Sequence, residues 1–130
     1  MTLQKLRSSY RVAETSDYDE CLKLLEEKGL ACEILYPTVI EERGGKIVGV
    51  LSTKSRGEMF VAGSFCCSSI FSGIKLGELY EKVLLDMGIK RYVFFIDKKD
   101  TKWINSIERF FGIKPFSSDE DSYWYLREVV

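Results

Sequence analysis

The sequence contains no histidine among its 130 residues. A chain without histidine cannot form a Ser-His-Asp triad, a Cys-His nucleophile pair or a histidine-ligated zinc site. Any proton transfer must therefore use carboxylates, tyrosine, lysine, thiols or water.

The chain also lacks a surplus of positive charge, because 19 lysines and arginines face 20 aspartates and glutamates, for a formal net charge of -1. The densest basic cluster consists of Lys98, Lys99 and Lys102. It alternates with Asp97 and Asp100, so its local field is largely cancelled. We therefore expect no nucleic-acid partner.

Long hydrophobic runs are absent too, and none approaches the length of a membrane span. Residues 1–10 have no apolar core of the kind that signal peptides carry. The expectation is a cytoplasmic protein without a membrane partner. It should consist of one domain, residues 1–130, in which residues 1–9 form a loose leader.

The four cysteines, Cys21, Cys32, Cys66 and Cys67, contain no C-x-x-C pair. Neighbouring Cys66 and Cys67 would point to opposite faces of a strand, so they are poorly placed to clamp one metal ion. We expect buried, reduced thiols and no metal. An apolar setting would raise the thiol pKa values of Cys66 and Cys67, which argues against either as an acyl-carrying nucleophile.

Periodicity and turn residues divide the first half of the chain. A Gly44-Gly45 turn between two β-branched runs is a strong hairpin signal. Leu30 to Pro37 is compatible with either a short helix or extended chain. The elements expected here are a strand over 10–14, a helix that follows a capping-box-like pair at Ser16 and Asp19 and ends at Gly29, and strands over 38–42 and 46–54.

The stretch from Phe60 to Gly88 joins an apolar strand to an amphipathic helix through the short turn Ser68 to Gly73. The first free amides of such a helix can face an anion, which suggests a phosphate site. The simpler alternative is that Ser72 and Gly73 only cap and start the helix.

The second half predicts a buried strand over Arg91–Asp97 and a helix that is capped by Asp100 or Thr101 and ends at Gly112. A final aromatic strand follows over Ser122–Val129. If exposed, this strand could pair two subunits in a homodimer, and burial in the core explains its aromatic residues equally well.

The order of these elements predicts an α/β (α+β) fold with helices on both faces of a mixed, mostly antiparallel sheet. The strands on either side of the helix ending at Gly88 should be parallel neighbours, because a βαβ crossover connects them. A parallel pair in such a sheet can splay and leave a cleft at the carboxyl ends of its strands.

Three local sequences stand out within this order. They are the hairpin ERGGKIVGV (42–50), the helix end LLDMGIKR (84–91) before an apolar strand, and FFGI (110–113) at the end of the next helix. In these pieces and in element order the chain resembles the GNAT superfamily of acyl-CoA-dependent N-acetyltransferases over nearly its whole length.

The resemblance implies acetyl-CoA as co-substrate and transfer of its acetyl group to a primary amine of a small molecule or protein. The family's pyrophosphate turn resembles Arg/Gln-x-x-Gly-x-Gly/Ala, and its positions correspond to Ser68 through Gly73. Only Gly73 matches, while Ser68 and Phe71 depart from the pattern. The implied cofactor-binding residues are Phe65, Cys66, Cys67, Ile70, Phe71, Ser72, Gly73, Ile74 and Lys75.

The departures motivate an alternative, a GNAT-like binding or structural module that has lost catalysis. The two alternatives differ in whether the space before Gly73 is open to a diphosphate or filled by Phe71. Hydroxyl groups of Ser68, Ser69 and Ser72 could replace the missing motif side chains as donors to phosphate.

Catalytic groups are not identified by any motif. The position where many family members place a general-acid tyrosine holds Glu108. Glu58 and Glu108 are weak candidates for a base acting through water, and Glu41 and Glu42 are conceivable. For each, a solvated carboxylate without a role is the simpler interpretation.

Overall fold

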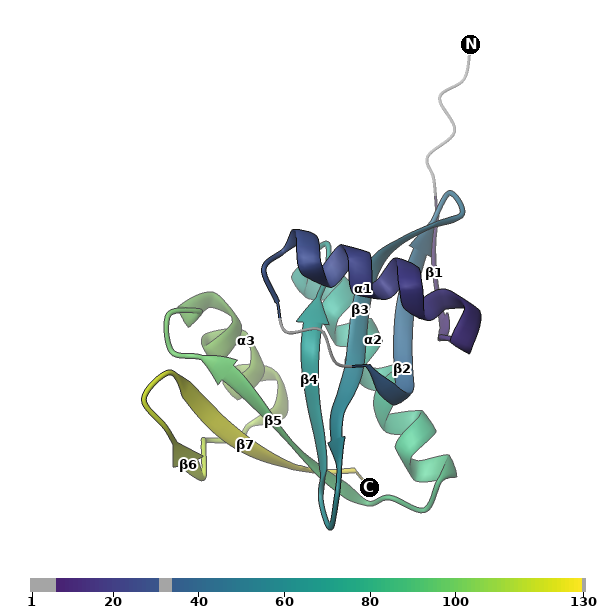
Figure 1. The fold of residues 1–130 in the computed structure, drawn as a ribbon. Coiled ribbons are helices and arrows are strands. Elements are labelled where there is room, and N and C mark those ends of the chain that lie inside the picture. Colours follow the sequence, from purple (N-terminus) through teal and green to yellow (C-terminus); the bar gives the residue numbers. More distant parts are fainter. Residues whose placement is uncertain (1–6, 31–33, 130) are drawn as a thin grey trace.

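The computed structural model describes residues 7–30 and 34–129. Within these residues the chain forms a seven-stranded sheet in the order β1-β2-β3-β4-β5-β7-β6 (Figure 1). The elements are β1 (Ser8–Val12), a 3-10 turn (Thr15–Asp17), α1 (Tyr18–Glu27), β2 (Leu35–Arg43), β3 (Lys46–Arg56), β4 (Phe60–Cys66), α2 (Ile70–Asp86), β5 (Arg91–Asp97), α3 (Thr101–Phe111), β6 (Ser117–Ser118) and β7 (Ser122–Glu128).

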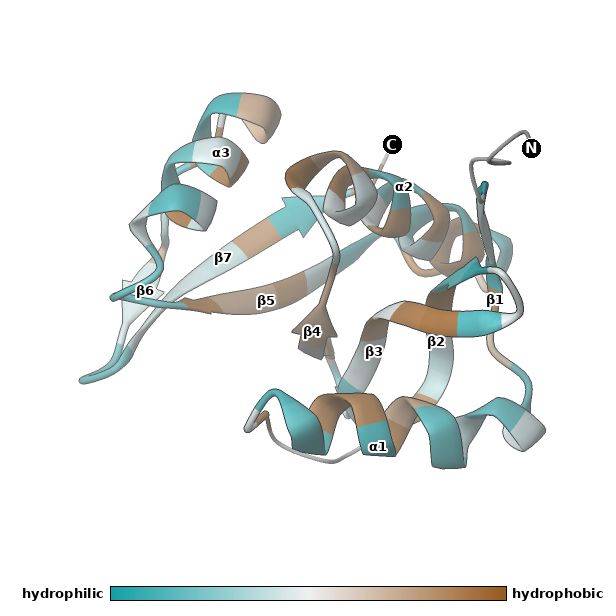
Figure 2. Ribbon diagram, turned by 90° about the horizontal axis from the view of Figure 1, so that it is seen from above, coloured by the Kyte–Doolittle hydropathy of each residue, from teal (hydrophilic) through white to brown (hydrophobic). Residues whose placement is uncertain are grey.

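Two helices cover opposite faces of the sheet, as the sequence predicts. Side chains alternate along β2, so Val39 packs in the cluster beneath α2 and Ile40 packs in the cluster beneath α1. Figure 2 shows α1 on one side of the strands, with α2 and α3 on the other. The sheet therefore has a separate core on each face.

The third helix lies on the same face as α2, over β5 and β7. The Tyr125 hydroxyl of β7 donates a hydrogen bond of 2.8 Å to Glu108 of α3. Arg127 of β7 stacks on Phe111 and also forms an ion pair with Glu81 of α2. The C-terminal strand thus connects α2 and α3 along the sheet.

The predicted parallel pair is confirmed. Phe60, Val61 and Ala62 of β4 pair with Tyr92, Val93 and Phe94 of β5, and the other strand pairs in the described sheet are antiparallel. After Ala62 the two strands diverge. The predicted hairpin is also confirmed, because Gly44 and Gly45 adopt positive φ angles of 60° and 77° between β2 and β3.

Some predicted boundaries are wrong. Ser8 and Ser9 belong to β1 and not to a loose leader, whereas residues 1–6 lie outside the described residues. The extended alternative holds from Leu35 onward, where β2 begins, and residues 31–33 are not described. The first capping box joins Glu14 and Asp17, two residues earlier than the predicted pair.

The predicted turn before α2 is shorter than expected. The helix begins at Ile70, and its N-cap is Ser69, whose side-chain oxygen accepts the Ser72 N–H at 3.1 Å. Ser72 and Gly73 therefore lie inside the first turns of α2 and do not cap it. The serine-rich sequence allows several caps, and in the structure Ser69 takes this position.

Candidate functional site

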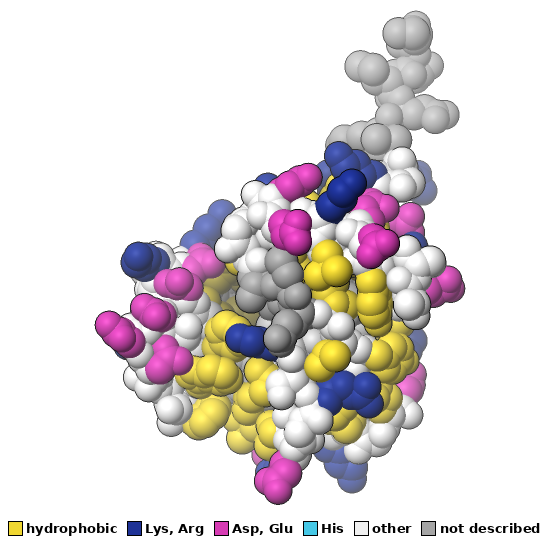
Figure 3. Space-filling model, in the orientation of Figure 1, with side chains coloured by type: hydrophobic (Ala, Val, Ile, Leu, Met, Phe, Trp, Pro, Cys, Tyr) yellow, Lys and Arg dark blue, Asp and Glu magenta, His cyan; other side chains and the backbone are white. Residues whose placement is uncertain are grey.

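A cleft of about 330 Å³ opens where β4 and β5 diverge. Its lining includes Phe65 from β4, Gly73 and Gly77 from α2, Phe95 from β5, and Trp103 from α3. Most of the lining is apolar, and the charged side chains among it are Lys54, Asp97 and Asp100. In Figure 3, hydrophobic side chains gather over β5 and β7 on the face beside α1.

Trp103 packs tightly against Gly73 in the lining of this cleft. A Cβ atom added to Gly73 would lie 2.3 Å from the indole carbon Cη2 of Trp103 and 3.1 Å from Cζ of Phe65. The rings of Phe65 and Trp103 meet edge to face, with centroids 5.1 Å apart. Gly73 is thus a position at which α3 approaches α2 closely, and no larger residue fits there in this conformation.

Phe71 does not fill the space before Gly73. Its side chain points outward and is 65% exposed, and the Lys75 ammonium lies 5.5 Å from the ring centroid. Of the two alternatives, the one in which Phe71 fills this space does not match the structure, because the first turn of α2 directs this residue to solvent. The rings closest to Gly73 belong to Trp103 and Phe65.

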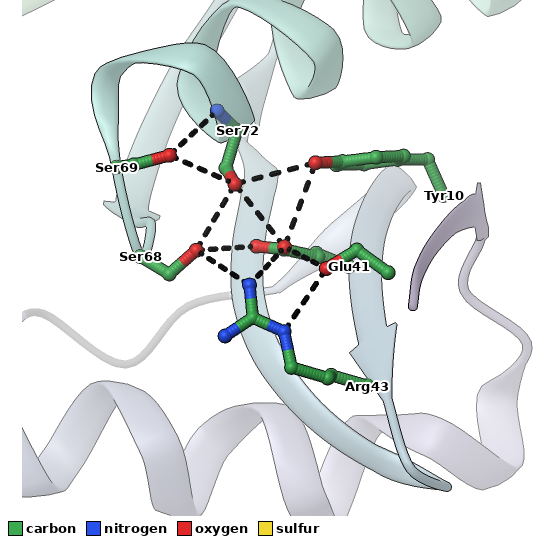
Figure 4. Close-up of polar contacts among 7 residues, drawn as sticks. Tyr10, Glu41, Arg43, Ser68, Ser69 and Ser72 are labelled. Atoms are coloured by element: carbon green, nitrogen blue, oxygen red, sulfur yellow. Dashed lines mark hydrogen bonds and ion pairs between the residues drawn. The ribbon is translucent and has the colours of Figure 1, made fainter. Parts of the chain in front are cut away.

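Beneath the amino end of α2 lies the carboxylate of Glu41, which is fully buried on β2 (Figure 4). Its oxygens accept hydrogen bonds from Ser8 at 2.6 Å, Ser68 at 3.0 Å and Ser72 at 3.1 Å. The Arg43 guanidinium lies 3.2 Å away and is partly exposed. These contacts connect β1, β2 and α2 at one point.

The Glu41 carboxyl is held in its ionised form. Burial alone would raise its pKa, but the hydrogen bonds from Ser8, Ser68 and Ser72 and the charge of Arg43 together keep the pKa below its ordinary value of 4.5. The amino end of α2 also favours a nearby anion. Glu41 is therefore a structural anion whose acceptor positions are already used.

This network overturns the expectation that the serines face a phosphate. Ser68 and Ser72 donate to Glu41, and the Ser69 hydroxyl donates to Ser72 at 3.2 Å. A buried carboxylate needs several donors, and the serine hydroxyls satisfy it. The groups that α2 presents to solvent at its amino end are backbone amides. Helical geometry leaves the amides of Ile70 and Phe71 without an intrahelical partner.

Comparison with solved structures identifies the fold. The chain is similar to YncA, a putative acetyltransferase from Salmonella typhimurium solved with acetyl-CoA, with a TM-score of 0.73 at 11% identity over 95% of this chain and 94% of that one. It is also similar to the PaiA N-acetyltransferase of Thermoplasma acidophilum in complex with coenzyme A, with a TM-score of 0.74 at 11% identity over 94% and 99% of the two chains.

The chain has the GNAT fold. A third similar structure is FeeM, an N-acyl amino acid synthase from uncultured soil microbes, with a TM-score of 0.72 at 14% identity over 96% of this chain and 92% of that one. No protein-family model matches the sequence, and a search of curated proteins finds no match either. The likeness is therefore one of structure, at sequence identities that show the fold.

On this GNAT fold, the cleft lining contains some of the predicted cofactor-binding residues and leaves out others, Cys66 and Cys67 among them. Phe65, Ile70, Gly73 and Ile74 line the cleft and are brought together there. Phe71, Ser72 and Lys75 belong to the first turns of α2 outside this lining, with Phe71 and Lys75 exposed and Ser72 buried.

The predicted bases lie away from the cleft lining. Glu58 is exposed in the turn before β4, at the opposite end of that strand from α2. Glu108 pairs with Lys114 at 2.9 Å, and this bond together with that from Tyr125 lowers its pKa. Glu42 pairs with Arg11. The structure does not bring these carboxylates together at the cleft.

The cysteines on β4 and after it point to opposite faces, as predicted. Cys66 packs in the cluster beneath α1, and Cys67 packs in the cluster beneath α2. Burial raises the pKa of the Cys66 thiol and raises the pKa of Cys21 and of Cys67 to about 11. Cys32 lies outside the described residues.

We expect these three thiols to react slowly with a disulfide reagent such as Ellman's reagent. At Cys21 and Cys67, a thiol pKa near 11 lowers the thiolate fraction at neutral pH, and the higher nucleophilicity of the thiolate compensates only in part, so their rates should be about tenfold below that of a free thiol. The raised pKa of Cys66 should slow its reaction in the same direction. The measurement is the reaction rate of a Cys32→Ser variant in its folded form and in denaturant. Rates in the folded protein equal to those in denaturant would contradict this prediction.

Sequence reasoning missed several residues of the site. Trp103, Gly77, Asp97 and Asp100 line the cleft, together with Lys54 from β3. The helical periodicity of α3 identifies Trp103 as apolar but does not specify which neighbour it meets. In the sequence, Asp97 and Asp100 belong to a cluster of alternating charges, which gives no sign of a binding site. They lie at the cleft because β5 diverges from β4.

Metal and membrane features can be stated for the described part of the chain. No three potential ligands among its cysteines, aspartates and glutamates come together to hold a metal ion. Among the residues that the structure describes, no helix has the length and apolar character to cross a membrane.

Proposed function

We propose that this protein is an acyltransferase that moves the acetyl group of acetyl-CoA to a primary amine of a small molecule or protein. The observation that carries the proposal is the position of the cleft. It opens between the parallel strands β4 and β5 and ends at the amino end of α2, and GNAT structures similar to this chain carry acetyl-CoA or coenzyme A.

The cleft walls fit the arm of such a thioester. Beyond Ala62, the pairing of β4 within the described sheet is with β3 alone, so one backbone edge of Gly63 to Cys66 faces the divergence. Unpaired strand edges bind extended groups through main-chain hydrogen bonds. The apolar side chains around this edge would bury the aliphatic parts of the arm.

The amino end of α2 fits a diphosphate. The amides of Ile70 and Phe71 point out of the helix, and the positive end of the helix dipole favours an anion there. Lys75 lies exposed one turn further along. Glu41 lies on the inner side of this helix end and accepts hydrogen bonds from the hydroxyls of Ser68 and Ser72. Phosphate would therefore be bound by the backbone amides.

A bound acetyl thioester supplies an acyl carbon to which the amine nitrogen bonds as the C–S bond breaks, while one proton leaves the nitrogen and the thiolate sulfur is protonated. The chain's carboxylates at the cleft are Asp97 and Asp100, at the carboxyl end of β5. They attract a protonated amine and can accept its proton through water. Asp97 is oriented by the Lys99 N–H, which donates to it at 2.8 Å.

Gly77 allows a direct test of the cleft. It lines the cleft from the middle of α2, and a Cβ added to it meets no atom within 4 Å. Gly77→Leu should therefore fold and fill the cleft, with acetyl-CoA affinity reduced about tenfold or more. Calorimetric titration with acetyl-CoA measures the loss, and mass spectrometry of an amine panel measures acetyl transfer.

Gly77→Ala is the matched control, since it adds one methyl group at the same place. It should keep acetyl-CoA binding and stabilise the helix by about 0.5 to 1 kcal/mol. Equal binding by the wild type and the leucine variant would place the ligand elsewhere and contradict the proposal. Binding without transfer to any amine would instead support the second candidate, a GNAT-fold binding module, which the incomplete phosphate motif favours.

A further inference from the structure

We infer that the acceptor is an arylalkylamine, a primary amine joined by a short linker to an aromatic ring, and that its ring binds beside the cleft on Phe95 and Trp124. This inference rests on the proposed function and deepens it by naming the class of acceptor. It concerns the face of β5 and β7 that no helix of the described residues covers, where two aromatic side chains lead from solvent to the cleft.

One face of β5 and β7 is open to solvent. Side chains alternate along a strand, so Val93 and Phe95 share this face with their cross-strand partners Leu126 and Trp124. The strand residues packed beneath α1 belong to β2, β3 and β4, and in Figure 2 β5 and β7 extend away from α1. Leu126 is 36% exposed. Apolar side chains therefore remain accessible here, as Figure 3 shows.

Phe95 connects this open face to the cleft. It lines the cleft, and its ring centroid lies 4.9 Å from that of Trp124. A Cβ added to Gly63 would lie 3.3 Å from Cε1 of the Phe95 ring. Gly63 follows Ala62, the last residue of β4 that pairs with β5. The Phe95 ring thus borders the strand edge proposed for the thioester arm, and an acceptor ring on Trp124 lies one short linker away from it.

The charges at the cleft favour a cationic acceptor without a carboxylate. The charged residues in the described lining are Lys54, Asp97 and Asp100, which sum to one negative charge. Asp97 follows Phe95 by two residues, so its side chain leaves β5 on the same open face. The Lys54 ammonium lies over the Phe95 ring, 4.9 Å from its centroid. An ammonium near Asp97 and an aromatic ring packed on Trp124 therefore suit this surface together.

Two primary amines of similar basicity separate recognition of the ring from reactivity of the nitrogen. Phenethylamine carries an aromatic ring, and ethanolamine carries a hydroxyl group in its place. At saturating acetyl-CoA, kcat/KM for phenethylamine should exceed that for ethanolamine by at least about tenfold, because the ring buries apolar surface on Phe95 and Trp124. Phenylalanine, which adds a carboxylate, should be a poorer acceptor than phenethylamine. Release of the coenzyme A thiol measures all three rates.

Trp124→Ala should raise KM for phenethylamine about tenfold and change kcat little. Trp124 is not among the residues that line the cleft, so acetyl-CoA affinity and KM for ethanolamine should stay unchanged. Trp124→Leu keeps apolar packing on Phe95 and provides a second variant if the alanine variant does not fold, with a rise of about threefold. Tyr123→Ala is the matched control, because Tyr123 is the neighbouring aromatic residue of β7 and faces the opposite side. It should leave the preference for phenethylamine intact.

Several outcomes would overturn the inference while acetyl transfer itself stands. They are equal kcat/KM for phenethylamine and ethanolamine, a higher kcat/KM for phenylalanine, transfer to other amines only, and Trp124 variants that raise KM for both amines equally. If the wild type does not bind acetyl-CoA in a calorimetric titration, the proposed function fails and the inference fails with it.

Discussion

Replacement of Glu41 by glutamine is expected to lower the free energy of unfolding by about 3 kcal/mol. The side chain is fully buried, and the hydroxyls of Ser8, Ser68 and Ser72 donate to its two oxygens. Glutamine keeps the volume but has one acceptor oxygen and an NH₂ group that faces donors. Urea denaturation of the two proteins, followed by circular dichroism, measures the difference.

The loss should depend on pH in a defined direction. The pKa of Glu41 is lower in the folded protein than its ordinary value of 4.5, so its ionised form contributes stability above that pH. This contribution disappears as the pH falls through the folded-state pKa. On acidification, the free energy of unfolding of the wild type should therefore fall more steeply than that of Glu41→Gln. At low pH the two free energies should become similar.

Glu42→Gln serves as the comparison at the neighbouring position. Glu42 is paired with Arg11 at a partly exposed site, where such ion pairs contribute only about 0.5 kcal/mol. Equal losses for the two variants would mean that the buried network does not set the stability of this region. A Glu41→Gln protein as stable as the wild type would contradict the structural role directly.

Two glycines on α2 should respond in opposite directions to the same substitution. Gly73→Ala should destabilise the protein by about 2 kcal/mol, because its methyl group would lie 2.3 Å from the Trp103 ring. Gly77→Ala should stabilise it by about 0.5 to 1 kcal/mol, because nothing lies near its Cβ and alanine favours the helix. Thermal and urea unfolding of both variants test the signs.

A double-mutant cycle identifies the cause at Gly73. If the loss comes from the indole, Gly73→Ala should cost little in a Trp103→Ala background, with a coupling energy of about 1 to 2 kcal/mol. Additive effects would show that the methyl group disturbs α2 for another reason.

Local chemistry made much of the fold predictable. The Gly44-Gly45 turn between β-branched runs gave the hairpin, and the glycines at 88 and 112 ended α2 and α3 with positive φ angles of 80° and 64°. The crossover rule then made β4 and β5 parallel. Each of these conclusions depends on a few consecutive residues, or on one rule of handedness, and both are visible in a sequence.

The site was harder to predict, because its contacts join residues far apart in the chain. The serines before α2 suggested donors for phosphate, and only the fold revealed that Glu41, on β2, takes up two of them. Phe71 looked like an obstruction, but the helix start at Ile70 turns it outward. The direction of a side chain depends on the residue at which the helix begins. A serine-rich turn does not specify that residue, because several serines could serve as the N-cap.

Sequence patterns were enough to predict the order of the elements, the parallel strand pair and a cleft at the amino end of α2. The contacts around the amino end of α2 became known only from the tertiary structure. Burial of Glu41 under α2 and the packing of Trp103 on Gly73 both depend on how β1, β2 and α3 are placed around α2. Such placements result from long-range packing, whereas local pattern constrains only the turns and faces that make them possible.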